Sequence, residues 1–326
     1  MPDAIGGYFE LELRKGQNPY PQALGFNSAR SAFRALLVAR RVSKVHLPHY
    51  LCNVMQEALN GTNIEQLRYG LSDELQLQSL PTLNPDEALL YVDYFGLKSD
   101  YIREVLAPHY KHQLIVDNSQ ALFSEPLPAT ATLYSPRKFV GVADGGWLVN
   151  APSNLPTAAP SYSQGRFAAL LGRLEDAPQQ HYAAFQSCEQ TLQQEGVKAM
   201  SASTARLLDS IDYAWIAQQR TSNLAHLRQR LDEHNLFTAW PSRPVAGLCY
   251  PLLLACAEAT ARLRAHLLEH SIFVPCYWHE VLQAAATPAI ERSWAQCLLP
   301  LPIDQRYSVD DMDRLADTIL QHMRTS

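Results

Sequence analysis

Short apolar runs alternate with a helix-like segment through the first half of the chain. Runs at 45–47, 63–67, 88–94 and 114–117 indicate strands, of which those at 88–94 and 114–117 have the composition of buried ones, and the segment 102–110 is typical of a helix. Strands that alternate with helices imply right-handed crossovers and a mostly parallel sheet. We therefore predict an α/β fold, in which ligands bind where the strands reach their carboxyl ends.

Length and composition restrict the class of protein. A chain of 326 residues, 47% hydrophobic and 18% charged, can bury a sizeable core and fits two domains. Because the net charge is −5 and no basic block occurs, we do not expect nucleic acid as a partner. The N-terminus lacks a charged region followed by an apolar one, and no run of about 18 uncharged apolar residues occurs. We therefore expect neither a signal peptide nor a membrane span.

Cysteine and histidine spacing gives no sign of a metal site. The six cysteines are scattered without a C-x-x-C pair, which favours reduced thiols in a cytoplasm over a zinc or disulfide framework. His266 and His270 are four residues apart on an expected helix, but the full H-E-x-x-H pattern is absent. We interpret these two histidines as part of an exposed helical face and predict no metal.

The stretch 114–146 contains the strongest chemical pattern. Its first strand ends in Asp117, and further on Ser-Pro-Arg-Lys at 135–138 precedes a Gly-Gly turn at 145–146. A lysine amine can bind pyridoxal 5'-phosphate covalently, and a carboxylate can keep the pyridine nitrogen of that cofactor protonated. Either residue alone is common in α/β proteins, as a strand-end carboxylate or a surface lysine. Their order, together with Ser-x-x-Lys and the glycine pair, favours the cofactor.

On these residues the chain resembles the fold-type I aminotransferases that use pyridoxal phosphate, most closely the DegT/DnrJ/EryC1/StrS family of sugar aminotransferases. The resemblance spans nearly the whole chain, is most specific between 114 and 149, and is diffuse toward the C-terminus. It implies a three-layer αβα large domain with a mostly parallel sheet at residues 1–220, including an N-terminal arm, and a small C-terminal α/β domain at 221–326. It also implies a homodimer, because active sites of the family use residues from both subunits.

The resemblance implies roles for residues around the two strands. Lys138 would be the lysine that binds the cofactor, Asp117 would face the pyridine nitrogen, and Gln120 would bond to the 3-hydroxyl. Ser135 would add a hydroxyl to the phosphate site, and Tyr94 would lie at a strand end beside the cofactor. The spacing Ser-x-x-Lys matches the broad aminotransferase class, whereas the sugar branch usually has Ser-Phe-His-x-x-Lys.

A helix start upstream is the expected phosphate site. Asn27 or Ser28 is a good N-cap, and a helix N-terminus with small residues exposes backbone N–H groups that favour an anion. In the family a small-residue motif at this point holds the cofactor phosphate. The resemblance therefore implies Asn27, Ser28 and Ala29 as cofactor ligands.

Two positions near the expected site stay open. The residue that stacks on the pyridine ring in the family is most often aromatic, but the matching position is Cys52, and Tyr50 or His49 could substitute for it. Trp278 and His279 match a segment that lies near the substrate mouth in the family. Packing in the core is the more ordinary role for the tryptophan.

The resemblance implies an aminotransferase that moves an amino group from an amino-acid donor to a keto acceptor, which we expect to be a nucleotide-linked keto-sugar. Arg137, Arg166 and Arg243 are candidates for binding a substrate carboxylate, and the sequence does not rank them. One alternative is another reaction on the same cofactor, as in a lyase, dehydratase or racemase. Family dehydratases replace the lysine with histidine, so Lys138 argues against that reaction. The other alternative is a non-catalytic protein that kept the fold.

Overall fold

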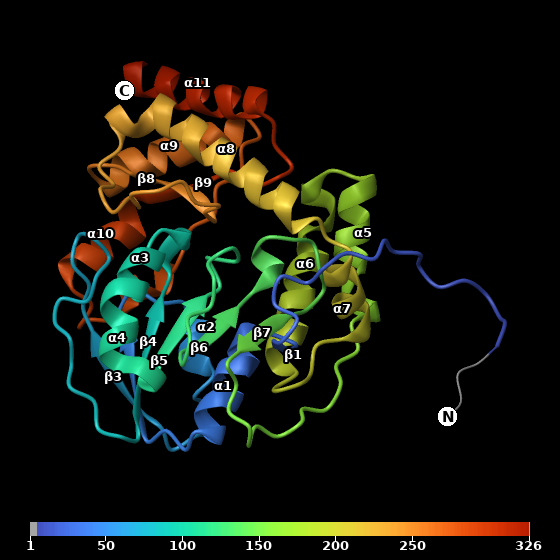
Figure 1. Ribbon diagram of the computed structural model, residues 1–326. Helices are drawn as coiled ribbons and strands as arrows, with labels where there is room; N and C mark the ends of the chain where they lie inside the picture. Colours follow the sequence, from blue (N-terminus) through green and yellow to red (C-terminus); the bar gives the residue numbers. More distant parts are fainter. Residues whose placement is uncertain (1–4, 326) are drawn as a thin grey trace.

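The structure, a computed structural model that describes residues 5–325, is built on two sheets (Figure 1). The larger sheet has seven strands in the order β1-β7-β6-β5-β4-β2-β3. These strands are β1 Leu24–Phe26, β2 Lys44–Pro48, β3 Glu65–Tyr69, β4 Glu87–Val92, β5 Leu114–Asn118, β6 Ala131–Tyr134 and β7 Gly146–Val149. Among them β7 is antiparallel to both of its neighbours, and the remaining neighbours pair in parallel. The predicted α/β fold with a mostly parallel sheet is confirmed.

The central strands are buried on both faces. Every residue of β4 and β5 is buried, which explains why their sequences are nearly continuous apolar runs rather than alternating ones. Such a sheet needs helices on both faces. The helices of this larger part are α1 Ala29–Ala39, α2 Asn53–Glu57, α3 Ser99–Tyr101, α4 Ala107–Tyr110, α5 Ala168–Glu175, α6 Pro178–Gln194 and α7 Ala202–Asp209.

A long helix, α8 Tyr213–Leu231, leads from the larger part to the smaller one (Figure 1). The smaller part contains an antiparallel pair, β8 Cys249–Leu253 and β9 Leu298–Pro302, with the helices α9 Ala257–Glu269, α10 Ala289–Cys297 and α11 Val309–Thr325. The domain boundary predicted near residue 220 falls inside α8 and stays a prediction. No helix within residues 5–325 has both the length and the hydropathy needed to cross a bilayer.

The apolar triplet 272–274, whose residue types favour a strand, does not form one. Ser271 has a left-handed backbone (φ 60°), and the N–H of Ile272 donates to the carbonyl of Leu267 at 2.8 Å. This is the hydrogen-bond pattern of a helix C-cap, in which an apolar residue follows the left-handed one. Ile272 therefore closes the end of α9 and does not extend a sheet.

The described N-terminal arm begins away from the rest of the molecule (Figure 1) and joins it further on, where the N–H of Gly16 donates to the carbonyl of Asp209 at 2.7 Å. The side chains of Ile5, Tyr8 and Phe9 are almost completely exposed, although all three are apolar or aromatic. Exposed apolar groups in a row are typical of a segment that packs on another molecule.

Candidate active site

The carboxylate of Asp117 lies at the carboxyl end of the central strand β5. The residue is 4% exposed, and its Oδ1 accepts the backbone N–H of Ser119 at 2.9 Å, which fixes the carboxylate in one orientation. The carbonyl of Asp117 accepts the N–H of Asp93, which follows β4, at 3.0 Å. The side chain is therefore held rigidly at the edge of the sheet where ligands of parallel α/β proteins bind.

Lys138 lies just past the end of the neighbouring strand β6. It ends a single 3₁₀ turn, Pro136–Lys138, in which its backbone N–H donates to the carbonyl of Ser135 at 3.1 Å. Pro136 and Phe139 are buried on either side of it, whereas Lys138 itself is exposed. The buried neighbours fix the turn, and the amine is presented to a reactant.

The residue after the lysine is held by the smaller part of the molecule. The guanidinium of Arg220, on α8, lies 4.6 Å from the ring centre of Phe139, and Gln305 Nε2 donates to the Phe139 carbonyl at 2.8 Å. Arg220 Nε in turn donates to Gln305 Oε1 at 3.1 Å. The position of Lys138 therefore depends on contacts between the two parts of the chain.

Cys52 lies within electrostatic reach of both Asp117 and Lys138. Burial raises the pKa of the Cys52 thiol, the ammonium group of Lys138 lowers it, and the carboxylates of Glu280 and Asp117 raise it. Cys52 precedes α2 as its N-cap and is half-buried. The structure thus gathers a thiol, an amine and two carboxylates from four distant segments of the chain.

Tyr50 and Tyr94, the two aromatic residues predicted to lie near the cofactor, belong to the core. The ring of Tyr50 lies 5.8 Å from that of Tyr94, 4.4 Å from that of Trp278 and 5.3 Å from that of Trp294, measured between ring centres. Tyr50 is 1% exposed, and the hydroxyl of Tyr94 donates to its carbonyl at 2.8 Å. Because other side chains cover the Tyr50 ring, Cys52 is the better candidate for contact with a cofactor ring.

Gln120 supports a strained turn next to the site. Phe95 has a left-handed backbone (φ 58°), which is unusual for a large residue, and its N–H donates to Gln120 Oε1 at 2.8 Å. The amide oxygen of Gln120 is therefore committed to the protein. The predicted bond to a cofactor hydroxyl would have to come from its Nε2 group.

The start of α1 is packed closely against the Gly145–Gly146 turn. The N–H of Gly145 donates to the carbonyl of Asn27 at 2.8 Å, and a Cβ on Gly146 would lie 2.2 Å from the carbonyl carbon of Ser28. The Ser28 hydroxyl caps the helix by accepting the N–H of Ser31 at 3.1 Å. What this helix start offers a ligand is therefore mainly the N–H groups of its first turn, which have no partners within the helix.

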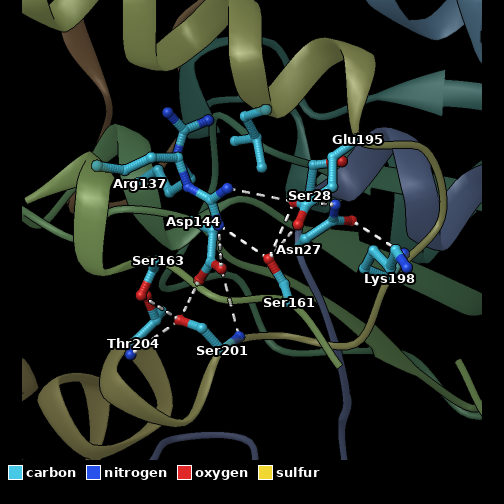
Figure 2. A network of polar contacts seen from close by, with 12 residues as sticks. Asn27, Ser28, Arg137, Asp144, Ser161, Ser163, Glu195, Lys198, Ser201 and Thr204 are labelled. Carbon is cyan, nitrogen blue, oxygen red and sulfur yellow. Dashed lines mark hydrogen bonds and ion pairs between the residues drawn. The ribbon is translucent and has the colours of Figure 1, made fainter. Parts of the chain in front are cut away.

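The side chain of Asn27 is occupied by the protein. It is fully buried, and its Nδ2 donates to Glu195 Oε2 at 3.1 Å and to the carbonyl of Gly196 at 3.0 Å (Figure 2). Ala29 has no polar side chain and can offer only its backbone. The roles predicted for Asn27, Ser28 and Ala29 as cofactor ligands stay predictions, with the backbone rather than the side chains as the available group.

The structure ranks the three candidate arginines. Arg166 is buried and donates through Nη2 to Asp144 Oδ2 at 3.0 Å, within a network that includes Ser161 and Ser201 (Figure 2). This pairing neutralises Arg166 inside the protein. Arg166 therefore stabilises the turn before the glycine pair and is a poor candidate for binding substrate.

Arg243 belongs to a different cavity. It pairs with Asp100 at 3.2 Å and lines a pocket of about 710 Å³ that also contacts Asp93 and Asn118. Because successive side chains of a strand point to opposite faces, Asn118 and Asp117 lie on different faces of the sheet. Of the three arginines, Arg137 is the one that adjoins Lys138.

These groups fit pyridoxal phosphate at its reactive end. A primary amine and a fixed carboxylate at adjacent strand ends, Lys138 and Asp117, match the aldehyde and the ring nitrogen of that cofactor. A cation and a helix start, Arg137 and the first turn of α1, can hold its phosphate. In the described part of the chain no group of three or more His, Cys, Asp or Glu side chains could hold a metal ion.

Two residues near the site have no signal in the sequence. Glu280, from the 3₁₀ segment His279–Gln283, acts on the Cys52 thiol, and Glu189, from α6, pairs with Arg137. Both are isolated charged residues far along the chain from the motifs. Only the folded chain places them at the site.

The architecture is that of the fold-type I aminotransferases, with a seven-stranded mostly parallel sheet and a small C-terminal sheet. Similar solved structures include the aminotransferase TlmJ from Streptoalloteichus hindustanus (15% identity, TM-score 0.67, covering 93% of this chain and 86% of TlmJ). The sugar aminotransferase CalS13 from Micromonospora echinospora is similar over 92% of this chain and 87% of its own, at 17% identity and a TM-score of 0.63.

A third similar structure is NtdA from Bacillus subtilis with bound PMP, at 14% identity and a TM-score of 0.63, covering 93% of this chain and 73% of NtdA. No family model matches the sequence. No curated protein matches it either. At these identities the likeness establishes the fold that this chain shares with sugar aminotransferases.

Proposed function

We propose that this protein is a pyridoxal-phosphate-dependent aminotransferase. It moves an amino group from an amino-acid donor to a keto acceptor, and a nucleotide-linked keto-sugar is the acceptor class. The observation that supports this most directly is a buried carboxylate and an exposed amine on two paired strands: Asp117 lies on β5 opposite Leu133 of β6, and Lys138 follows the end of β6. The shared fold with sugar aminotransferases supports the choice of reaction.

Each side chain has a distinct role in this reaction. The cofactor, when bound, supplies a ring that accepts electrons from the bond broken at the substrate. Lys138 Nζ would hold the cofactor and, as a free amine, would move a proton as general base and acid. Asp117 would keep the ring nitrogen protonated, because its carboxylate is sheltered and fixed by Ser119. Cys52 would lie against the face of the ring.

We also propose that the protein acts as a homodimer in the cytoplasm. Large apolar side chains are exposed on neighbouring helices, namely Leu174 on α5 with Tyr182 and Phe185 on α6. These residues and the N-terminal arm would be covered by a second copy. All six cysteines are free thiols, which agrees with a reducing compartment.

The visible absorption spectrum tests the proposed function. Wild-type protein mixed with pyridoxal phosphate should develop an absorption band that borohydride removes, and Lys138→Ala should not. Lys44→Ala, which removes a lysine at the start of β2 and so at the opposite edge of the sheet, is the matched control and should form the band as wild type does. If wild type shows no such band, the aminotransferase proposal is wrong and a non-catalytic role becomes the better one. If the band forms, a screen of amino donors separates transamination from lyase or racemase chemistry.

A further inference from the structure

The guanidinium of Arg137 lies against α6, where it pairs with Glu189. Arg137 directly precedes Lys138, yet its side chain is only 18% exposed. Burial lowers the pKa of Arg137 to about 10, so it is a cation at neutral pH, and Asp144, Arg166 and Arg30 lie within electrostatic reach of it. Arg30 is the second residue of α1. Its Nη2 donates to the carbonyls of Leu192 and Gln193, about one turn along α6 from the Glu189 that pairs with Arg137. Both arginines therefore meet the same stretch of α6, and this contact brings Arg137, which directly precedes Lys138, near the helix start that is the predicted phosphate site.

Arg137 is only half-satisfied by the protein. Its Nη2 pairs with Glu189 of α6, whereas its buried Nε has no hydrogen-bond partner among the described residues. Nε and Nη2 form the two parallel donors of a guanidinium fork, which matches two oxygens of a phosphate or carboxylate. Glu189 uses one of these donors and is itself 40% exposed. Such a partly exposed ion pair is weak and can be exchanged.

The carboxylates around this point outnumber the cations by one even without a phosphate. The cations are Arg30, Arg137 and Arg166, and the carboxylates that pair with them are Glu57, Glu189, Asp144 and Glu195 (Figure 2 shows the part around Asp144). A phosphate dianion added to this set would face excess negative charge. Among these carboxylates Glu189 is on a largely exposed helix, so it can move into water at little cost.

We propose that Arg137 binds the phosphate group of the cofactor and that Glu189 is a displaceable counter-ion, which occupies the arginine until the phosphate replaces it. The inference rests on the proposed function, because the phosphate is that of pyridoxal phosphate. It assigns the phosphate to a guanidinium fork, in a chain whose Asn27 and Ser28 side chains are used for structure. The exchange involves ions and hydrogen bonds only.

The first experiment compares pyridoxal phosphate with pyridoxal, which lacks the phosphate, in stopped-flow binding to the full-length protein. Glu189→Gln should bind pyridoxal phosphate about threefold more tightly than wild type, since an exposed ion pair no longer competes. Arg137→Gln should bind it about tenfold more weakly or worse, since a charged hydrogen bond is lost. Glu175→Gln, an equal charge change at an exposed position on α5, is the control and should match wild type. Affinity for pyridoxal should be the same in all four proteins.

A second readout uses inorganic phosphate and needs no covalent chemistry. Phosphate should raise the melting temperature of wild type, raise that of Glu189→Gln further, and leave Arg137→Gln unchanged. Arg137→Lys keeps the charge without the fork and should restore only part of the effect.

The outcomes separate the two proposals. If wild type forms no covalent complex with pyridoxal phosphate, the proposed function fails, and the phosphate melting series decides the role of Arg137. If wild type binds pyridoxal phosphate but the Arg137 and Glu189 variants behave like Glu175→Gln, the counter-ion inference is overturned while the function stands.

Discussion

Gly146→Ala should be one of the most damaging single-methyl changes in this protein. A Cβ at this position would lie 2.2 Å from the carbonyl carbon and 2.6 Å from the carbonyl oxygen of Ser28, and 2.3 Å from the nitrogen of Ala29. All three are backbone atoms, so no side chain can rotate away. To reach ordinary contact at about 3.5 Å, the start of β7 or of α1 must move by roughly 1.3 Å.

We expect this change to cost about 3 kcal/mol in the free energy of unfolding, at the upper end of the range for overpacking in a well-packed core. Urea denaturation followed by circular dichroism measures this cost from the shift of the midpoint at constant slope. The shift of α1 should also weaken pyridoxal phosphate binding, because the helix start moves relative to Lys138.

Gly165→Ala is the matched control for this substitution. No heavy atom lies within 4 Å of the Cβ that it would add, so its stability should change by about 0.5 kcal/mol or less. If Gly146→Ala costs less than about 1 kcal/mol, the close packing between β7 and α1 is not as the structure describes it.

Two further substitutions test how the site is held together. Lys138→Met should slow alkylation of Cys52 by iodoacetamide at neutral pH, because loss of the ammonium raises the thiol pKa and leaves less thiolate; Lys15→Met should not. Peptide mass spectrometry measures this rate. Equal rates in the two variants would show that the Lys138 ammonium does not act on the Cys52 thiol. Arg220→Leu should cost about 1–3 kcal/mol in urea denaturation, because the carbonyl of Gly247, which accepts its Nη1 at 3.3 Å, stays buried without a donor. A cost below about 1 kcal/mol would contradict that account.

The local pattern of the sequence is sufficient for the fold class, and it singles out the two groups that we predict to be reactive. The buried strands appear as apolar runs because both faces of a parallel sheet are covered, and that signal is local. Asp117 and Lys138 follow two such strands, and neighbouring parallel strands end at the same edge of a sheet. Their proximity therefore follows from the order of residues along the chain.

Contacts between distant segments are decided by the tertiary structure. Ile272 has the apolar character of a strand residue, but its N–H is used to cap α9. By residue type Tyr50 is as suitable for stacking on a cofactor ring as any aromatic residue. In the folded chain its ring is covered by Trp278 and Trp294, from the smaller part. Asn27 is a good helix cap by residue type, yet its side chain bonds to Glu195, far along the chain.

The tertiary structure also decides how far each candidate arginine is already paired within the protein. The sequence does not distinguish Arg137 from Arg166, since each is a cation close to the motifs. The fold surrounds Arg166 with two carboxylates, Asp144 and Glu195, whereas within residues 5–325 the ion-pair partner of Arg137 is the partly exposed Glu189. Residue type determines which chemistry a side chain can perform. How far its hydrogen bonds and charge are already used depends on partners that only the folded chain brings together.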